Sequence, residues 1–131
     1  MTTEHAAPKL DKNDPDVIVR AYKFALKPTT SQEQKLRQHT GGARFVYNYL
    51  IAQWHDDIRT RIEEKERGVS KDELTPFTFK LSTYDMINYW NRTKRERAPW
   101  WLEVSKEISN DAAHRAYDSM KNWLDSRSGK R

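Results

Sequence analysis

The sequence contains no cysteine, only four glycines and no long apolar run. The absence of cysteine excludes disulfide bonds and zinc sites with thiolate ligands, and it is compatible with a reducing, cytoplasmic location. No stretch approaches the roughly 20 apolar residues that a membrane-spanning helix needs. The first residues also lack the basic and apolar regions of a signal peptide. We therefore expect no membrane among the partners of this chain.

Charge and aromatic side chains are abundant. Charged residues make up 33% of the 131 residues and hydrophobic residues 36%, with 5 Trp, 6 Tyr and 4 Phe. This length suits one domain, and the bulky rings give it much apolar area to bury. The net charge of +5 and the pI of about 9.5 permit binding to nucleic acid but do not establish it.

The clearest helical pattern lies between Pro28 and Ile62. Thr29 and Gln32 have the spacing of a capping box, which predicts a helix that starts after Thr29. Gly41 suits a left-handed helix end, so we predict a break there and a second helix that Gly68 ends. The two helices would form a helix-turn-helix-like hairpin. Apolar residues of the second helix recur at spacings of three and four and predict a buried face: Phe45, Val46, Tyr49, Leu50, Trp54, Ile58 and Ile62.

The remaining elements are predicted from shorter patterns. Residues 17–27 alternate and are rich in β-branched and aromatic side chains, which predicts a strand that needs a partner. A short second extended piece is possible at residues 76–79. A third helix is expected from about Ser82 to before Pro99, with Tyr84, Met86, Ile87, Tyr89 and Trp90 as its apolar residues. The compact aromatic link that follows at residues 99–102 is expected to pack onto the core. A last helix is expected from about Ser109 to Asp125, with a face of Ile108, Ala112, Ala116, Met120 and Trp123.

These elements predict a mainly α fold, a four-helix recognition bundle with one N-terminal β-strand. The expected organisation is a disordered arm at 1–16, a helical domain at 17–125 and a basic tail at 126–131.

No set of residues has the pattern of a catalytic site. The four histidines, His5, His39, His55 and His114, do not pair with acids at the spacing of metal ligands. No glycine-rich loop resembles a phosphate cradle, and no turn presents a nucleophile. We therefore predict no catalytic residue, no metal and no cofactor.

Two motifs carry a family resemblance. The run Arg20-Ala-Tyr-Lys-Phe-Ala-Leu-Lys-Pro-Thr29 and the run Arg44-Phe-Val-Tyr-Asn48 resemble the N-terminus of the OrfB/TnpB family of transposon-encoded proteins. Weaker similarity continues at residues 81–85, 99–104 and 112–123, so the resemblance covers about residues 17–125. Ser105 stands where the family often has proline, so the sequence departs from the family pattern at the start of the last helix.

The resemblance implies a function. Full-length members resemble RNA-guided DNA endonucleases, whose RuvC-like catalytic domain and cysteine-ligated zinc element lie downstream of the matched segment. This chain would then correspond to the N-terminal portion, a first wedge strand with a helical recognition domain that binds guide RNA and target. It is expected not to be an enzyme by itself, and a C-terminal part of a transposase is a possible partner.

The residues expected to touch nucleic acid are cations for phosphates and one polar side chain for bases. Lys23 and Lys27 would share one face of the predicted strand, and Arg44 would stand at a helix start, where the dipole disfavours a cation. The alternative interpretations are hydrogen bonds that orient the hairpin for Tyr47 and Asn48, and helix-end stabilisation for the last four cations. The candidates are Arg20, Lys23, Lys27, Arg44, Asn48, Arg92, Lys94, Arg95 and Arg97.

Two classes of function remain open at this point. The first is a non-catalytic nucleic-acid-binding module, for DNA or RNA, and the second is a small helical module that binds another protein. An inactive transposase remnant is a third possibility. Positive charge gathered on one face would favour the first, and a large apolar patch would favour the second.

Overall fold

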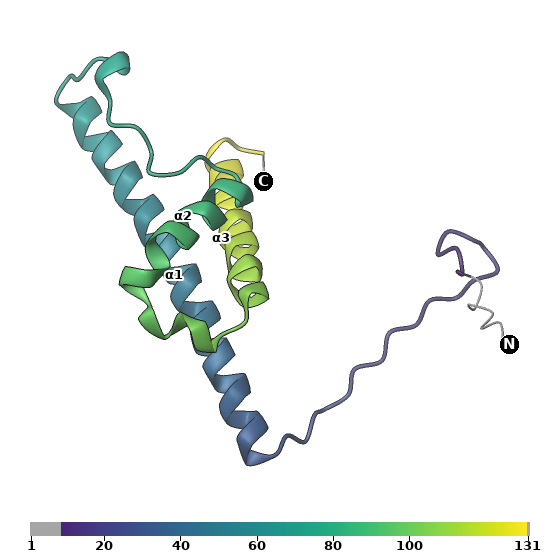
Figure 1. Ribbon diagram of the computed structural model, residues 1–131. Helices are drawn as coiled ribbons and strands as arrows, with labels where there is room; N and C mark the ends of the chain where they lie inside the picture. The colour runs from purple at the N-terminus through teal and green to yellow at the C-terminus, as the bar shows by residue number, and fades with distance from the viewer. Residues whose placement is uncertain (1–8, 131) are drawn as a thin grey trace, which may run out of the picture.

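The computed structural model describes residues 9–130, and within them the chain is helical with no strand (Figure 1). There are three α-helices and two short 3₁₀-helices. The α-helices are α1 (Thr30–Glu66), α2 (Thr83–Arg97) and α3 (Lys106–Arg127), and the 3₁₀-helices are η1 (Lys71–Glu73) and η2 (Pro99–Glu103). Helix α1 contacts both α2 and α3, which also contact each other. None of the helices in these residues has the length and apolar composition that crossing a membrane requires.

Both predicted ends of the long helical stretch are confirmed. Thr29 and Gln32 form the capping box: the Thr29 hydroxyl accepts from the Gln32 N–H at 3.3 Å, and the Gln32 side chain accepts from the Thr29 N–H at 2.9 Å. At the other end Gly68 has a φ of +79°. The N–H of Val69 bonds to the Glu64 carbonyl, and that of Gly68 bonds to the next carbonyl along. These two bonds are those of a Schellman motif, which ends the helix.

The predicted break at the glycine pair is wrong, because α1 runs through Gly41 and Gly42 without interruption (Figure 1). The reason is packing. A Cβ on Gly42 would lie 3.1 Å from Val104 Cγ1 and 3.2 Å from Trp101 Cζ3, whereas a Cβ on Gly41 would meet nothing within 4 Å. Gly42 therefore lets η2 approach the side of α1, and the two helices expected here are one. The four-helix prediction is corrected to three α-helices.

The two glycines allow a matched test of this explanation. Gly41→Ala is expected to raise the free energy of unfolding by about 0.5–1 kcal/mol, because alanine favours a helix interior. Gly42→Ala gains the same propensity but crowds two buried side chains, and overpacking of a core costs about 1–3 kcal/mol. We expect a net loss of about 1 kcal/mol, measured by urea unfolding followed by circular dichroism. Equal stabilisation by both substitutions would contradict the packing explanation.

The core lies where the three helices meet, and it confirms most of the predicted apolar faces. The small alanines of α3 let α1 and α2 come close to its backbone. Ile62, Tyr84 and Trp123 are more exposed than their positions in the patterns suggested. The buried hydrophobic residues on the α-helices are Val46, Leu50 and Trp54 of α1, Met86 and Trp90 of α2, and Ala112, Ala113, Ala116 and Met120 of α3.

An aromatic cluster joins α1, α2 and η2. The Trp90 ring meets Trp101 edge-on at 4.9 Å between centroids, Tyr49 at 5.6 Å and Phe45 at 6.1 Å. The predicted packing of the aromatic link is thus confirmed at Trp101, which is buried, whereas Leu102 is 96% exposed.

The predicted strand at residues 17–27 is wrong. These residues are extended, but in the described chain no other segment pairs with them, and they run away from the helices as an exposed segment (Figure 1). The alternation survives locally, since the rings of Tyr22 and Phe24 stack at 6.4 Å on one side. Extended backbone without a partner leaves its hydrogen-bonding groups to solvent, so alternation alone does not make a strand.

Other boundaries also differ from the predictions. Residues 76–79 form no strand: Thr78 is bonded to Asp57 through its N–H at 2.8 Å and its hydroxyl at 2.9 Å. The last helix begins at Lys106, three residues earlier than expected, because Ser105 caps it. The domain division stays a prediction, and residues 1–8 and 131 of its arm and tail lie outside the described residues.

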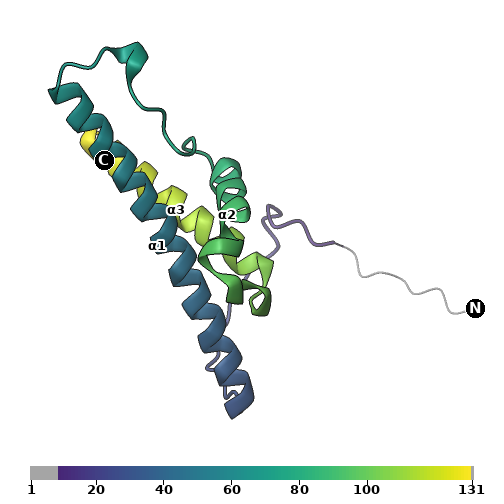
Figure 2. The ribbon, with the colours of Figure 1, turned by 60° about the vertical axis from the view of Figure 1, so that its left-hand side comes forward.

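The loop between α1 and α2 is fastened to α1 by a carboxylate. Glu64 is buried and accepts from both the N–H of Thr75, at 2.9 Å, and the hydroxyl of the same residue. These two hydrogen bonds hold the pKa of the Glu64 carboxyl below its ordinary value. The loop therefore returns along the last turns of α1 before it enters α2 (Figure 2).

Candidate nucleic-acid interface

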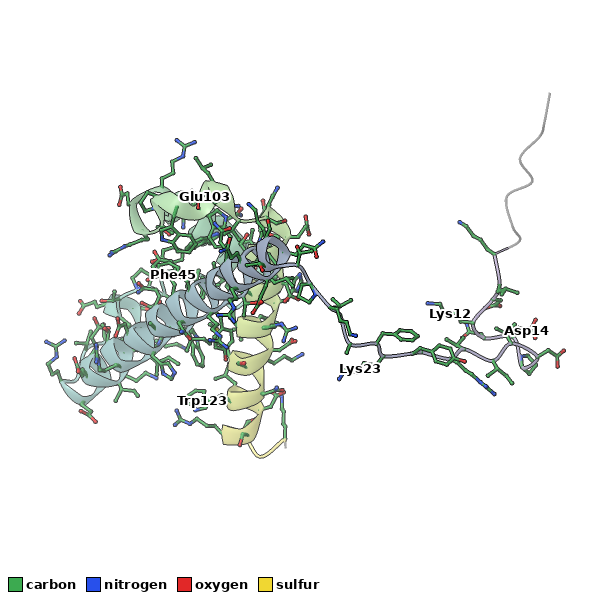
Figure 3. The ribbon with its side chains drawn as sticks, turned by 90° about the horizontal axis from the view of Figure 1, so that it is seen from below. Lys12, Asp14, Lys23, Phe45, Glu103 and Trp123 are labelled. Atoms are coloured by element: carbon green, nitrogen blue, oxygen red, sulfur yellow. The ribbon has the colours of Figure 1, made fainter. Side chains whose placement is uncertain are left out.

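The nine residues predicted to touch nucleic acid fall on three parts of the structure. Three lie on the extended segment before α1, two on α1 and four in the last turns of α2. In that order they are Arg20, Lys23 and Lys27; Arg44 and Asn48; and Arg92, Lys94, Arg95 and Arg97. All are exposed except Lys94, which is half-buried. Figure 3 shows Lys23 on the extended segment, clear of the helices.

A groove between α1 and α3 brings Arg44 and Asn48 together. It has a volume of about 430 Å³, and its α3 side includes Asp111 and Arg115. The hydroxyl of Tyr47 lies 2.9 Å from Ser119 Oγ and ties the two helices together below the groove. Tyr47 therefore has the structural role that we considered for it, while Arg44 and Asn48 stay exposed.

Two further hollows continue this groove toward the start of α1. One, of about 540 Å³, contains Lys27 and Lys35 and shares Leu36 and His39 with the groove. The other, of about 480 Å³, contains Glu33 and Arg37 and shares Arg44 with it. We call this continuous area the α1 basic surface and define it by its charged residues and Asn48: Lys27, Glu33, Lys35, Arg37, Arg44, Asn48, Asp111 and Arg115.

The α1 basic surface is positive overall. Its five cations and two carboxylates give a net charge of +3. Glu33 pairs with Arg37 at 2.6 Å, and Asp111 pairs with Arg115 at 2.8 Å and raises the pKa of that guanidinium by hydrogen bonding. Both carboxylates are thus engaged within the surface. No ion pair in the described residues involves Lys27, Lys35 or Arg44, which can meet phosphates without losing a partner.

Sequence reasoning missed Lys35, Arg37 and Arg115. The signal was present, because Arg37 and Arg44 are seven residues apart and share one face of a continuous helix. The assumed break at Gly41 separated them. The same error placed Arg44 at a helix start, whereas α1 begins at Thr30 and the dipole acts only over the first turn. The dipole argument for Arg44 is therefore wrong, and its place in the groove replaces that argument.

The four cations of α2 are not gathered with this surface. Helix α2 packs on the side of α1 that carries Tyr49, whose hydroxyl donates to Thr93 Oγ1 at 2.8 Å, while Tyr47 faces α3. Lys94, Arg95 and Arg97 lie in the last turn of α2, where cations favour the helix dipole. Their position therefore fits helix-end stabilisation, and their contact with nucleic acid stays a prediction. In the described residues no three His, Asp or Glu side chains gather as a metal site would require.

Comparisons with known proteins identify the segment that contains most of this surface. Residues 18–63 match a family model for the OrfB type, described as a helix-turn-helix domain, which confirms the resemblance stated above. Two curated proteins of Mycobacterium tuberculosis, from strains CDC 1551 and H37Rv, are each 30% identical to the chain over 121 residues. Both are named as candidate RNA-guided DNA endonucleases. No solved structure matches the chain significantly.

The matches cover only part of the relatives, and the matched residues do not form a helix-turn-helix. The alignment covers 86% of this chain but 24% of each relative, so the chain spans about a quarter of the length of the curated relatives it matches. Within the matched residues 18–63 the structure has an extended segment and one continuous helix, without the turn that the family description mentions. A recognition helix set off by a turn is thus not what this geometry offers.

Proposed function

We propose, since residues 18–63 match the helix-turn-helix domain model of the OrfB type, that this chain is a nucleic-acid-binding module that does not cleave nucleic acid by itself. The observation that carries the proposal is the α1 basic surface, with its net charge of +3 and three cations that form no ion pair within residues 9–130. Cations on a continuous surface bind the phosphate backbone through counterion release.

The proposed contacts follow the course of the surface. Lys27, Lys35 and Arg44 meet successive phosphates, and Arg44 can hold one phosphate through two N–H groups. Arg20 and Lys23 extend the cationic series along the exposed segment. Asn48, on the rim of the groove, supplies donors and an acceptor for a base edge.

The choice of polymer follows from the relatives. Their names combine an RNA guide with a DNA target, so both polymers are candidates for this chain.

The partners of the acidic side chains support the proposal that this chain does not cleave nucleic acid. Metal-dependent cleavage needs clustered acidic ligands, but these carboxylates each bind a separate partner: Glu33, Asp56, Asp57, Glu64 and Asp111. A C-terminal part of a transposase stays a predicted partner of this chain, and co-purification of the two would test it.

The test is direct binding of the full chain to fluorescent oligonucleotides of single-stranded RNA, single-stranded DNA and duplex DNA, measured by anisotropy. The variant Lys27→Ala/Lys35→Ala/Arg44→Ala removes about three phosphate contacts. We expect roughly a tenfold or greater loss of affinity at ~50 mM salt, and a salt slope reduced by about one for each contact. The oligonucleotide should be recovered at full length after incubation with Mg²⁺ or Mn²⁺.

A matched control is the variant Lys71→Ala/Lys121→Ala/Lys130→Ala, which removes the same charge from exposed positions outside the surface. It should bind within about threefold of the unchanged chain. If the control loses as much affinity as the α1 variant, net charge rather than this surface determines binding. Absence of binding at ~50 mM salt, or cleavage that depends on an acid of this chain, would overturn the proposed function.

A further inference from the structure

A second, larger groove lies at the opposite end of α1, outside the α1 basic surface. It has a volume of about 780 Å³ and is enclosed by the last turns of α1, the end of α3 and the loop that follows α1. Its exposed apolar residues are both aliphatic and aromatic: Ile62 is 46% exposed, Leu81 and Leu124 are each 38% exposed, and Phe77 and Trp123 also line the groove. The hydrogen bond from the Thr75 N–H to the Glu64 carboxylate holds the loop against α1. The side of the groove that the loop forms is therefore in place before a ligand binds.

The rim of this groove is cationic. It contains Arg61 and Lys65 from α1, Lys80 from the loop and Arg127 from α3, and none of the described residues that line the groove is acidic. Two of these cations rest on aromatic rings. The Arg61 guanidinium lies 4.9 Å above the Phe77 ring, and the Arg127 guanidinium lies 4.9 Å above the ring of Trp123, which Figure 3 shows on α3.

We propose that this groove binds an acidic amphipathic helix of a partner protein. Exposed aliphatic side chains need an apolar face to cover them, and a helix offers one through residues at i, i+3 or i+4, and i+7. The rim of the groove has four cations and no acid among its described residues, so a complementary partner helix would have carboxylates on both sides of its apolar face. The proposal does not depend on nucleic-acid binding elsewhere in the chain.

The same features count against single-stranded nucleic acid as the occupant. Bases bind by stacking on open aromatic faces, but one face of Phe77 and one of Trp123 is already covered by a guanidinium. The exposed aliphatic side chains of Ile62, Leu81 and Leu124 cannot form hydrogen bonds with base edges. Arg61 is 17 residues from Arg44 along α1, about 25 Å at 1.5 Å per residue, so the two surfaces do not overlap.

The experiment uses the full chain and three labelled synthetic peptides of about 18 residues, measured by fluorescence anisotropy. The first peptide has leucines at helical spacing flanked by glutamates. The second keeps the leucines but has lysines in place of glutamates, and the third keeps the glutamates but has serines in place of leucines. The first peptide is expected to bind at micromolar concentration, and the other two at least tenfold more weakly, because each lacks one of the two matching features.

Variants of the groove locate the binding. Lys80→Ala/Arg127→Ala and, separately, Leu124→Gln are each expected to weaken the first peptide about tenfold or more. The control Lys71→Ala/Lys121→Ala removes equal charge outside the groove and should change binding less than threefold. Equal binding by the groove variants would overturn the proposal, as would no binding of the first peptide at ~100 μM. Competition by a single-stranded oligonucleotide that Lys80→Ala/Arg127→Ala abolishes would assign the groove to nucleic acid instead.

Discussion

Trp90→Ala is expected to lower the free energy of unfolding by about 3–5 kcal/mol, the usual cost of removing a large buried ring. Trp90 is 1% exposed, and its ring meets three aromatic side chains from α1 and η2. The change would leave a cavity at the point where α1, α2 and η2 join. A small domain has roughly 5–15 kcal/mol of stability, so this loss is a large part of the total. Urea unfolding followed by circular dichroism measures it.

Two further substitutions separate the loss of the buried Trp90 ring from the loss of its N–H group and from the loss of an exposed ring on the same helix. The indole N–H of Trp90 is buried without a hydrogen-bond partner among the described residues, so Trp90→Phe removes an unpaired donor while keeping an aromatic ring. It should cost less than about 2 kcal/mol. Tyr84→Ala, on the exposed side of the same helix, should change stability by about 0.5 kcal/mol at most. A loss below ~1 kcal/mol for Trp90→Ala would contradict the central role of this ring in the core.

The second large effect is the dependence of nucleic-acid binding on salt. Each phosphate contact releases counterions, so log affinity falls linearly with log salt, with a slope of about −0.9 per contact for duplex DNA and −0.7 for single strands. Three or four contacts by the α1 basic surface give a fall of roughly 20- to 150-fold between ~50 and ~200 mM salt. Titrations of anisotropy at several salt concentrations measure the slope for each polymer.

The slope also tests how the surface binds. Contacts to phosphates carry no sequence information, so oligonucleotides of equal length and different sequence should bind within a few fold of one another. A shallow slope, corresponding to fewer than about two contacts, would mean that the basic surface is not the binding site. Strong sequence preference with a shallow slope would indicate readout of bases by other residues.

Local signals in the sequence predicted the ends of helices well. The capping box at Thr29, the positive φ at Gly68 and the cap at Ser82 all act through the residue itself and its near neighbours. The spacing of apolar residues likewise predicted the buried positions Val46 and Trp90, because helical period and burial are linked in any packed helix.

The errors came from interactions that are distant along the chain. Gly41 and Gly42 look alike in a sequence, and only the approach of Trp101 and Val104 shows why Gly42 lacks a side chain. Residues 17–27 have the composition of a strand, but a strand exists only with a partner, and the described chain supplies none. The candidate site also depends on distant interactions, because its charged residues are neighbours only when α1 is continuous and α3 lies beside it. These residues are Glu33, Arg37, Arg44, Asp111 and Arg115.

The continuity of α1 also sets the geometry between the two proposed binding surfaces. A helix of 37 residues is about 55 Å long, with a fixed rise and about 100° of rotation for each residue. The first half of α1 carries the basic surface, and the second half carries a wall of the apolar groove. A nucleic acid on the basic surface and a protein in the apolar groove would therefore be held at a fixed distance and a fixed angle around the helix axis. In this respect α1 is a rigid spacer, whose residue count determines how the two bound molecules face each other.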